Sequence, residues 1–219
     1  MSDAPLRTAV LISGSGTNLQ AIIDAMKAGR LPIDLCAVLS DQPQAQGLQR
    51  AGQAGIPAVT IDYRAFANRR EAERALHERL AALEPELVVL AGFMRILPDE
   101  LVEDFEGRML NIHPSLLPKY RGLHTFRRVL EAGDRVHGST VHFVVPELDA
   151  GPSIIQYRLP VRPDDTEDTL KQRVQRGEYL IYPRAIGWFA RGRLKLEDGA
   201  AWLDGERLES PVVVEEDDT

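Results

Sequence analysis

Short apolar runs alternate with amphipathic stretches along the first half of the chain. The segments 8–12, 35–39 and 87–91 are almost continuously apolar, and a further apolar strand begins at Met109. Runs without alternation are typical of strands that are buried on both faces of a parallel sheet. With a shorter strand at 57–61, the pattern predicts five such strands.

Amphipathic helical patterns fill the intervals between these strands. The first has apolar residues at helical spacing from Leu19 to Met26 and stops at Gly29; further helices are predicted at 45–54 and 66–83. Strands and helices that alternate with short connections form a parallel sheet covered by helices on both faces. The predicted fold class is therefore α/β with a mostly parallel central sheet.

The second half of the chain has a different pattern. Residues 114–125 carry two prolines and a glycine without periodicity, which predicts a loop, and a helix is predicted at 126–132. The segments 140–145 and 154–161 alternate like antiparallel strands, so we expect an antiparallel addition to the sheet. The last long helix is predicted to begin after residues 164–166, where Asp164, Asp165 and Thr166 are candidates for its N-cap.

We expect these elements to form one domain over residues 1–208, divided into two halves at about residue 105. Residues 209–219 are rich in Asp and Glu, and we predict a solvated acidic tail there.

The composition excludes some classes of binding partner. The chain has 219 residues and a net charge of −7, which argues against broad binding to nucleic acid or anionic membranes. Its N-terminal residues lack the pattern of a secretion signal, and no apolar run reaches membrane-spanning length. We therefore expect a cytoplasmic protein. We also expect small-molecule substrates and a monomer or weak homodimer. The single cysteine, Cys36, supports neither a disulfide nor a cysteine metal site.

Asn111 and His113 are the leading candidates for chemistry. They are two residues apart on a predicted strand, so their side chains project from the same face. An amide donor and an imidazole suit a carbonyl reaction in which charge grows on oxygen while a proton moves. The alternative is an edge-strand pair that is satisfied by loop backbone.

A glycine loop follows the first strand, and an acidic residue lies in a late turn. Gly14-x-Gly16 directs backbone N–H groups and a helix N-terminus toward an anion. The dinucleotide fingerprint is incomplete because Leu19 replaces its third glycine, so a phosphate monoester is favoured over NAD; a purely geometric turn is the alternative. Asp149 near His113 would favour the imidazolium and keep a proton available, although a turn-capping aspartate is commoner. No histidine pair has the spacing of a metal site, and we predict no metal.

Four segments occur in this order: Gly14-Ser15-Gly16-Thr17-Asn18-Leu19-Gln20-Ala21-Ile22, Leu90-Ala91-Gly92-Phe93-Met94-Arg95-Ile96-Leu97, Asn111-Ile112-His113-Pro114-Ser115-Leu116-Leu117-Pro118 and Glu147-Leu148-Asp149-Ala150-Gly151-Pro152. Together they resemble the phosphoribosylglycinamide formyltransferase family, the folate-dependent formyltransferases of purine synthesis. The resemblance runs from about Val10 to Leu208 and implies a Rossmann-like formyltransferase fold.

The resemblance also implies a role for each candidate residue. Asn111, His113 and Asp149 would be catalytic in formyl transfer from 10-formyltetrahydrofolate, the co-substrate, to glycinamide ribonucleotide. The N-terminal half would bind phosphate and the remainder would hold the folate and the catalytic residues. The ribonucleotide would contact Gly16, Thr17, Asn18, Gln175 and Glu178. The folate would contact Arg69, Met94, Arg95, Ile96, Leu97, Asn111, Val145, Glu147 and Asp149. Arg121 and Phe126 depart from residues frequent in the family.

Three alternatives stay open at this point. Methionyl-tRNA formyltransferase shares the chemistry but carries a tRNA-binding domain, for which this chain is short and acidic. Formyltetrahydrofolate deformylase uses water in place of the amine and has an N-terminal regulatory domain. A non-catalytic ligand-binding module would not need an acid at the end of a strand.

Overall fold

The computed structural model describes residues 4–216, which divide into two compact units at Leu110 and Asn111. This boundary lies five residues beyond the position expected for the two halves of the domain. None of the helices in the described part of the chain combines the length and apolar character needed to cross a bilayer.

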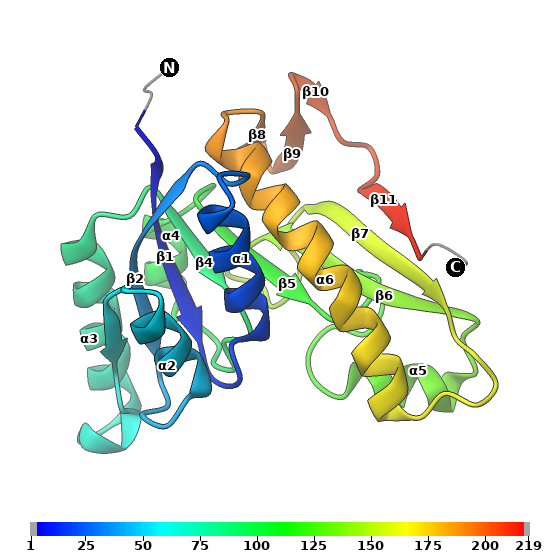
Figure 1. The fold of residues 1–219 in the computed structure, drawn as a ribbon, viewed down its shortest axis with the longest axis horizontal. Helices are drawn as coiled ribbons and strands as arrows, with labels where there is room; N and C mark the ends of the chain where they lie inside the picture. Colours follow the sequence, from blue (N-terminus) through cyan, green and yellow to red (C-terminus); the bar gives the residue numbers. More distant parts are fainter. Residues whose placement is uncertain (1–3, 217–219) are drawn as a thin grey trace. The chain divides into compact units, whose positions relative to one another are not determined.

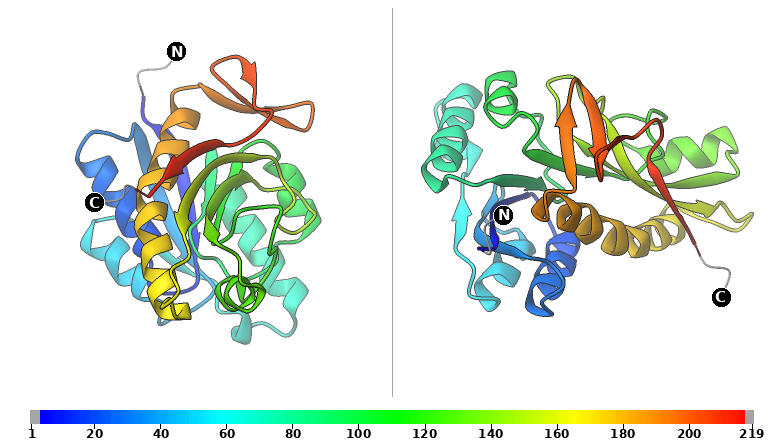
Figure 2. Two further views of the ribbon diagram at one scale, coloured as in Figure 1. Left: turned by 90° about the vertical axis from the view of Figure 1, so that its right-hand side faces the viewer. Right: turned by 90° about the horizontal axis from the view of Figure 1, so that it is seen from above.

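The first unit is built on parallel strands, as the apolar runs predict (Figure 1). Its strand order is β5-β4-β1-β2-β3, and β1 pairs in parallel with both β2 and β4. Figure 2 shows α1 and α2 on one face of these strands and α3 and α4 on the other. The elements are β1 (Leu6–Ile12), α1 (Thr17–Lys27), β2 (Ile33–Ser40), α2 (Gln46–Gln53), β3 (Ala58–Thr60), the 3-10 turn η1 (Tyr63–Ala65), α3 (Arg69–Leu83), β4 (Leu87–Leu90), α4 (Asp99–Asp104) and the start of β5 (Met109–His113).

Burial in the central strands explains their composition. Residues 9–12 of β1 and 87–89 of β4 are fully buried. Each large aliphatic side chain withdrawn from water there contributes about 1.5–3 kcal/mol. Helices on both faces leave no exposed side for polar residues, so the polar groups are displaced to the loops at the strand ends.

The second unit continues from β5 and contains the antiparallel addition. Its strand order is β11-β7-β6-β5, with β6 antiparallel to β7 and β11 parallel to β7. A separate sheet has the antiparallel order β10-β9-β8. The elements are α5 (Thr125–Ala132), β6 (Val136–Phe143), β7 (Ser153–Pro160), α6 (Glu167–Ala190), β8 (Leu194–Glu197), β9 (Ala200–Leu203), β10 (Glu206–Arg207) and β11 (Val212–Glu215).

Strand β6 begins earlier than the sequence pattern predicts. Gly138 falls inside the strand, where a glycine ordinarily weakens β structure. A Cβ at this position would overlap the backbone of Tyr157, so the glycine permits close approach of β7. The predicted start at residue 140 is therefore wrong because packing overrides the local preference.

The prediction of a solvated tail over residues 209–219 is wrong for its middle part. Strand β11 pairs in register with β7 between Val212 and Glu215. The Glu216 carboxylate then meets the buried Arg173 guanidinium of α6 at 2.5 Å. Arg173 also pairs with Asp165 at 2.8 Å. Two carboxylates therefore compensate the cost of burying its charge. The remainder of that prediction, residues 217–219, lies outside the described residues.

Gly177 provides a test of the packing between α6 and β7. A Cβ at 177 would overlap the ring of Tyr157. We expect Gly177→Ala to destabilise the protein by about 1–3 kcal/mol, the usual cost of overpacking. Gly52→Ala is the matched control, because Gly52 is also helical and has open space beside it. Thermal denaturation should show a lower midpoint for Gly177→Ala and an unchanged or higher one for Gly52→Ala; equal midpoints would contradict the packing argument.

Candidate functional site

The 13–18 loop joins β1 to α1 in the first unit. Gly16 is the N-cap of α1 and has φ 68°, a left-handed conformation that glycine adopts without strain. A Cβ on Gly16 would lie 2.6 Å from the Cα of Gly47, at the start of α2. The loop therefore requires glycine at this position. Its backbone N–H groups and the N-terminus of α1 form an arrangement suited to an anion.

Arg50 on α2 adds a cation beside this loop, which the sequence pattern did not indicate. Its Nε donates to the Ser15 carbonyl at 2.8 Å, and its Nη1 donates to Gln20 Oε1 at 3.2 Å. Positive charge next to exposed backbone N–H groups increases the attraction for a phosphate.

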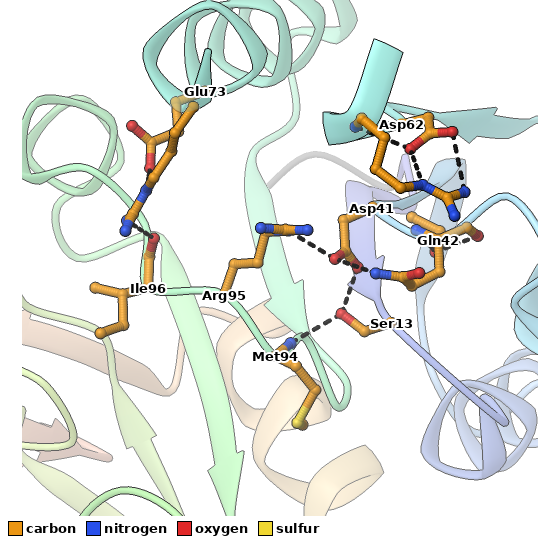
Figure 3. Close-up of polar contacts among 11 residues, drawn as sticks. Ser13, Asp41, Gln42, Asp62, Glu73, Met94, Arg95 and Ile96 are labelled. Carbon is orange, nitrogen blue, oxygen red and sulfur yellow. Dashed lines mark hydrogen bonds and ion pairs between the residues drawn. The ribbon is translucent and has the colours of Figure 1, made fainter. Parts of the chain in front are cut away.

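The 92–97 loop follows β4 in the same unit and is fastened to the end of β1. Ser13 N–H donates to the Gly92 carbonyl at 3.0 Å, and Met94 N–H donates to Ser13 Oγ at 2.9 Å. Figure 3 shows the side chain of Arg95 extending to Asp41, with 2.7 Å between Arg95 Nε and Asp41 Oδ2. Met94 and Ile96 are 67% and 56% exposed, so two large apolar residues of this loop are accessible to a ligand.

Arg69, at the start of α3, also reaches this loop. Its Nη2 donates to the Ile96 carbonyl at 3.2 Å and its Nε pairs with Glu73. The side chain is 63% exposed, so its charge stays accessible to a ligand. The structure thus brings Arg69 together with Met94, Arg95 and Ile96.

The second unit assembles His113 and Asp149 at short range. His113 Nδ1 lies 3.4 Å from Asp149 Oδ2, and both side chains are buried. His113 Nε2 lies 2.9 Å from the Tyr120 carbonyl, which can only accept a hydrogen bond. Both ring nitrogens therefore face oxygen atoms. Asp149 has φ 50°, in the left-handed region that aspartate tolerates better than most residues.

Residues 120–122 form hydrogen bonds with this pair. Gly122 N–H donates to Asp149 Oδ2 at 2.9 Å, so the loop supplies a donor to the carboxylate that faces His113. Arg121 pairs with Glu147 at 2.6 Å. This pair ties the loop that contains Arg121 to the β6–β7 turn. Val145, in the same turn, is half-buried.

His142 holds the Asn111 side chain, a role that sequence reasoning missed. Its Nδ1 is 2.8 Å from the Phe143 carbonyl, so Nδ1 carries a proton. Burial lowers the pKa of His142 to about 4, which leaves Nε2 unprotonated at neutral pH. Asn111 Nδ2 lies 3.1 Å from that nitrogen and donates to it. The amide is thereby oriented, and its second N–H stays available. Strand alternation places His142 opposite Val141 and Phe143, but does not reveal its contact with Asn111.

Gln175 and Glu178 lie on α6, three residues apart and on neighbouring surface positions of the helix. Gln175 is half-buried and Glu178 is buried. No group of three potential metal ligands occurs among residues 4–216.

Comparison with known proteins decides the family. The Formyl transferase family model matches residues 6–186. Phosphoribosylglycinamide formyltransferase from Escherichia coli (strain K12) is 54% identical over 199 residues, which cover 91% of this chain and 94% of that protein. The chain belongs to the phosphoribosylglycinamide formyltransferase family.

Solved structures of the family confirm the Rossmann-like formyltransferase fold. The phosphoribosylglycinamide formyltransferase from Coxiella burnetii matches with a TM-score of 0.91 and 50% identity, covering 95% of this chain and 99% of that one. A formyltetrahydrofolate deformylase from Pseudomonas putida KT2440 matches with a TM-score of 0.81 and 25% identity, covering 93% of this chain and 71% of that one. The fold is therefore compatible with both formyl transfer and hydrolysis.

The assigned state of His142 can be tested by NMR. We expect the Nδ1–H form at pH 7 and a titration midpoint near 4, because burial disfavours the charged ring. Histidine ¹⁵N shifts measured from pH 8 to about pH 3 would check this, with His142→Gln identifying the signals. A midpoint near the ordinary value of about 6.5 would contradict the orientation given to Asn111.

Proposed function

We propose that this enzyme transfers the formyl group of 10-formyltetrahydrofolate to the amine of N1-(5-phosphoribosyl)glycinamide. The products are formylglycinamide ribonucleotide and tetrahydrofolate, in purine biosynthesis. Membership of the family supports the reaction. The observation that carries the catalytic assignment is the contact of His113 Nδ1 with Asp149 Oδ2 at 3.4 Å, next to an Asn111 amide held by His142.

Asn111 and His113 would stabilise the tetrahedral intermediate. The substrate amine attacks the formyl carbon, a C–N bond forms, and the carbonyl oxygen becomes an oxyanion. The second amide N–H of Asn111 donates to that oxygen because the first is engaged by His142. Protonated His113 supplies further positive charge and acts as the general acid.

Asp149 would hold the His113 ring in place by facing its Nδ1 at 3.4 Å. A ring with a proton on each nitrogen can donate to both Asp149 and the Tyr120 carbonyl. When the intermediate collapses, the bond from carbon to the folate nitrogen breaks and that nitrogen takes a proton. The attacking amine releases one proton, so Asp149 and His113 can pass it between the two nitrogens.

The ribonucleotide would be held through its phosphate and its sugar. Gly16, Thr17 and Asn18 of the 13–18 loop would receive the phosphate on backbone N–H groups and the α1 N-terminus, with Arg50 adding charge. Gln175 and Glu178 would bind the ribose and glycinamide. The Glu178 carboxylate accepts hydrogen bonds, which suits the hydroxyl groups of a ribose.

The folate would be enclosed largely by backbone of the 92–97 loop, with its carboxylate tail at Arg69. Met94 and Ile96 present apolar side chains to solvent, which suits contact with a flat aromatic ring. The side chain of Arg95 is committed to Asp41, so any contact of Arg95 with folate would come from its main chain. Leu97, Val145 and Glu147 complete this proposed set, with Asn111 and Asp149 at the formyl end.

Deformylation by water is the second candidate, because a formyltetrahydrofolate deformylase shares the fold at a TM-score of 0.81. Family membership and the proposed phosphate site favour the amine as acceptor. We also propose that the enzyme is cytoplasmic, is a monomer or weak homodimer, and acts without metal, nucleic acid or membrane.

The two reactions differ in their need for the ribonucleotide. We expect tetrahydrofolate to form from 10-formyltetrahydrofolate only when glycinamide ribonucleotide is present, because an amine and not water attacks. Absorbance of the folate checks this, with buffer lacking the ribonucleotide as the control. Equal turnover without the amine would indicate a hydrolase, and no turnover with it would overturn the assignment.

Asn111→Ala tests the oxyanion role. We expect kcat to fall by roughly a hundredfold or more, as for other oxyanion donors, with little change in the KM of either substrate. Steady-state kinetics would measure this, with Asn68→Ala, which removes an exposed helix cap, as the control. A kcat within a few fold of the unmodified enzyme would remove Asn111 from this role.

A further inference from the structure

Ser13 fastens the 92–97 loop at two points. Its backbone N–H donates to the Gly92 carbonyl at 3.0 Å, and its Oγ accepts from Met94 N–H at 2.9 Å. Because the hydroxyl accepts from Met94, its own proton is free to be donated elsewhere. That proton goes to Asp41 Oδ1 at 2.5 Å. One residue of the 13–18 loop thus sets the path of the loop after β4.

Asp41 is the buried centre of this arrangement (Figure 3). Its Oδ1 accepts from Ser13, while its Oδ2 accepts from Gln42 Nε2 at 2.9 Å and from Arg95 Nε at 2.7 Å. A buried carboxylate is costly unless its oxygens are hydrogen-bonded and its charge is paired, and here both conditions are met. The carboxylate therefore determines where Ser13 and Arg95 lie.

The Arg95 side chain is held from a second direction by an aromatic ring. Its guanidinium carbon lies 3.8 Å from the centroid of Tyr63, within the range of a cation–π contact. The guanidinium is thus fixed between Asp41 and Tyr63. Its main chain, in the middle of the 92–97 loop, is fixed with it.

We propose that Asp41, Ser13 and the Arg95 side chain are positioning residues for folate: they hold the 92–97 loop in its binding conformation before the ligand arrives. This inference rests on the proposed function, in which the backbone of that loop contacts the pterin. A loop ordered in advance loses less conformational entropy on binding, so the arrangement increases folate affinity without touching the ligand.

The energetic consequence separates this role from catalysis. The network contacts the loop and none of His113, Asn111 or Asp149. Loss of the network should weaken binding of the folate in the ground state and in the transition state equally, which raises KM and leaves kcat almost unchanged. A group that acts on the reacting atoms would lower kcat instead.

Asp41→Ala and Arg95→Ala test the proposal in the full-length enzyme. We expect each to raise the KM for 10-formyltetrahydrofolate by about tenfold or more, with kcat and the KM for the ribonucleotide within about threefold of the unmodified enzyme. Because the two residues share the contact between Arg95 Nε and Asp41 Oδ2, the double variant should be less impaired than the sum of the two single effects. Glu167→Ala is the control, since Glu167 forms an exposed pair with Arg127 at 3.1 Å away from this network and should change folate KM by less than about twofold.

Several outcomes would overturn the inference. They are an unchanged folate KM in both single variants, a fall in kcat at unchanged KM, an equal rise in both KM values, or additive effects in the double variant. If Asp41→Ala fails to fold, Arg95→Ala decides, because that side chain is partly exposed. Unmodified enzyme that lacks ribonucleotide-dependent turnover would contradict the proposed function. If the unmodified enzyme is active and the variants leave its folate KM unchanged, this inference alone is contradicted.

Discussion

Burial of the central strands on both faces is the constraint on which the rest of the structure depends. Residues 9–12 of β1 and 87–89 of β4 are fully buried, and the two strands pair in parallel, so their carboxyl ends lie at the same edge of the sheet. The residues that follow them can therefore bond directly: the Met94 backbone N–H after β4 donates to Ser13 Oγ after β1. The two loops of the first unit are adjacent because the strands that precede them pair in parallel.

Satisfaction of buried polar groups organises the second unit in a comparable way. The low pKa of His142 and the Phe143 carbonyl together leave one ring nitrogen as an acceptor. Asn111 meets that acceptor, which determines the direction of its amide. A histidine that takes no part in the proposed proton transfer thus decides how the proposed oxyanion donor is presented. The hydrogen bond excludes other orientations of the Asn111 amide, because a buried unsatisfied donor costs about 1–3 kcal/mol.

The resemblance of four segments identified the family, and the comparisons confirm that prediction together with the α/β fold. The proposed pairing of His113 with Asp149 agrees with their separation of 3.4 Å across 36 positions of sequence. Local pattern reasoning was wrong at Gly138 and at residues 212–216. In both places a long-range neighbour, Tyr157 or Arg173, outweighs the local preference.

The sequence by itself determined most of the strands and helices as far as α6, because hydrophobic periodicity reports burial directly. It did not predict the short strands β8 to β11 that follow α6. It also determined the chemical types at the proposed site, since Asn111, His113 and the glycine loop stand at strand ends. Only the tertiary structure decided which polar groups meet. Asp41 is close to Arg95 in space but 54 residues away in sequence, and no local pattern encodes that contact. Hydrogen bonds are short and directional, so they are decided by the packing of distant elements and become visible only in three dimensions.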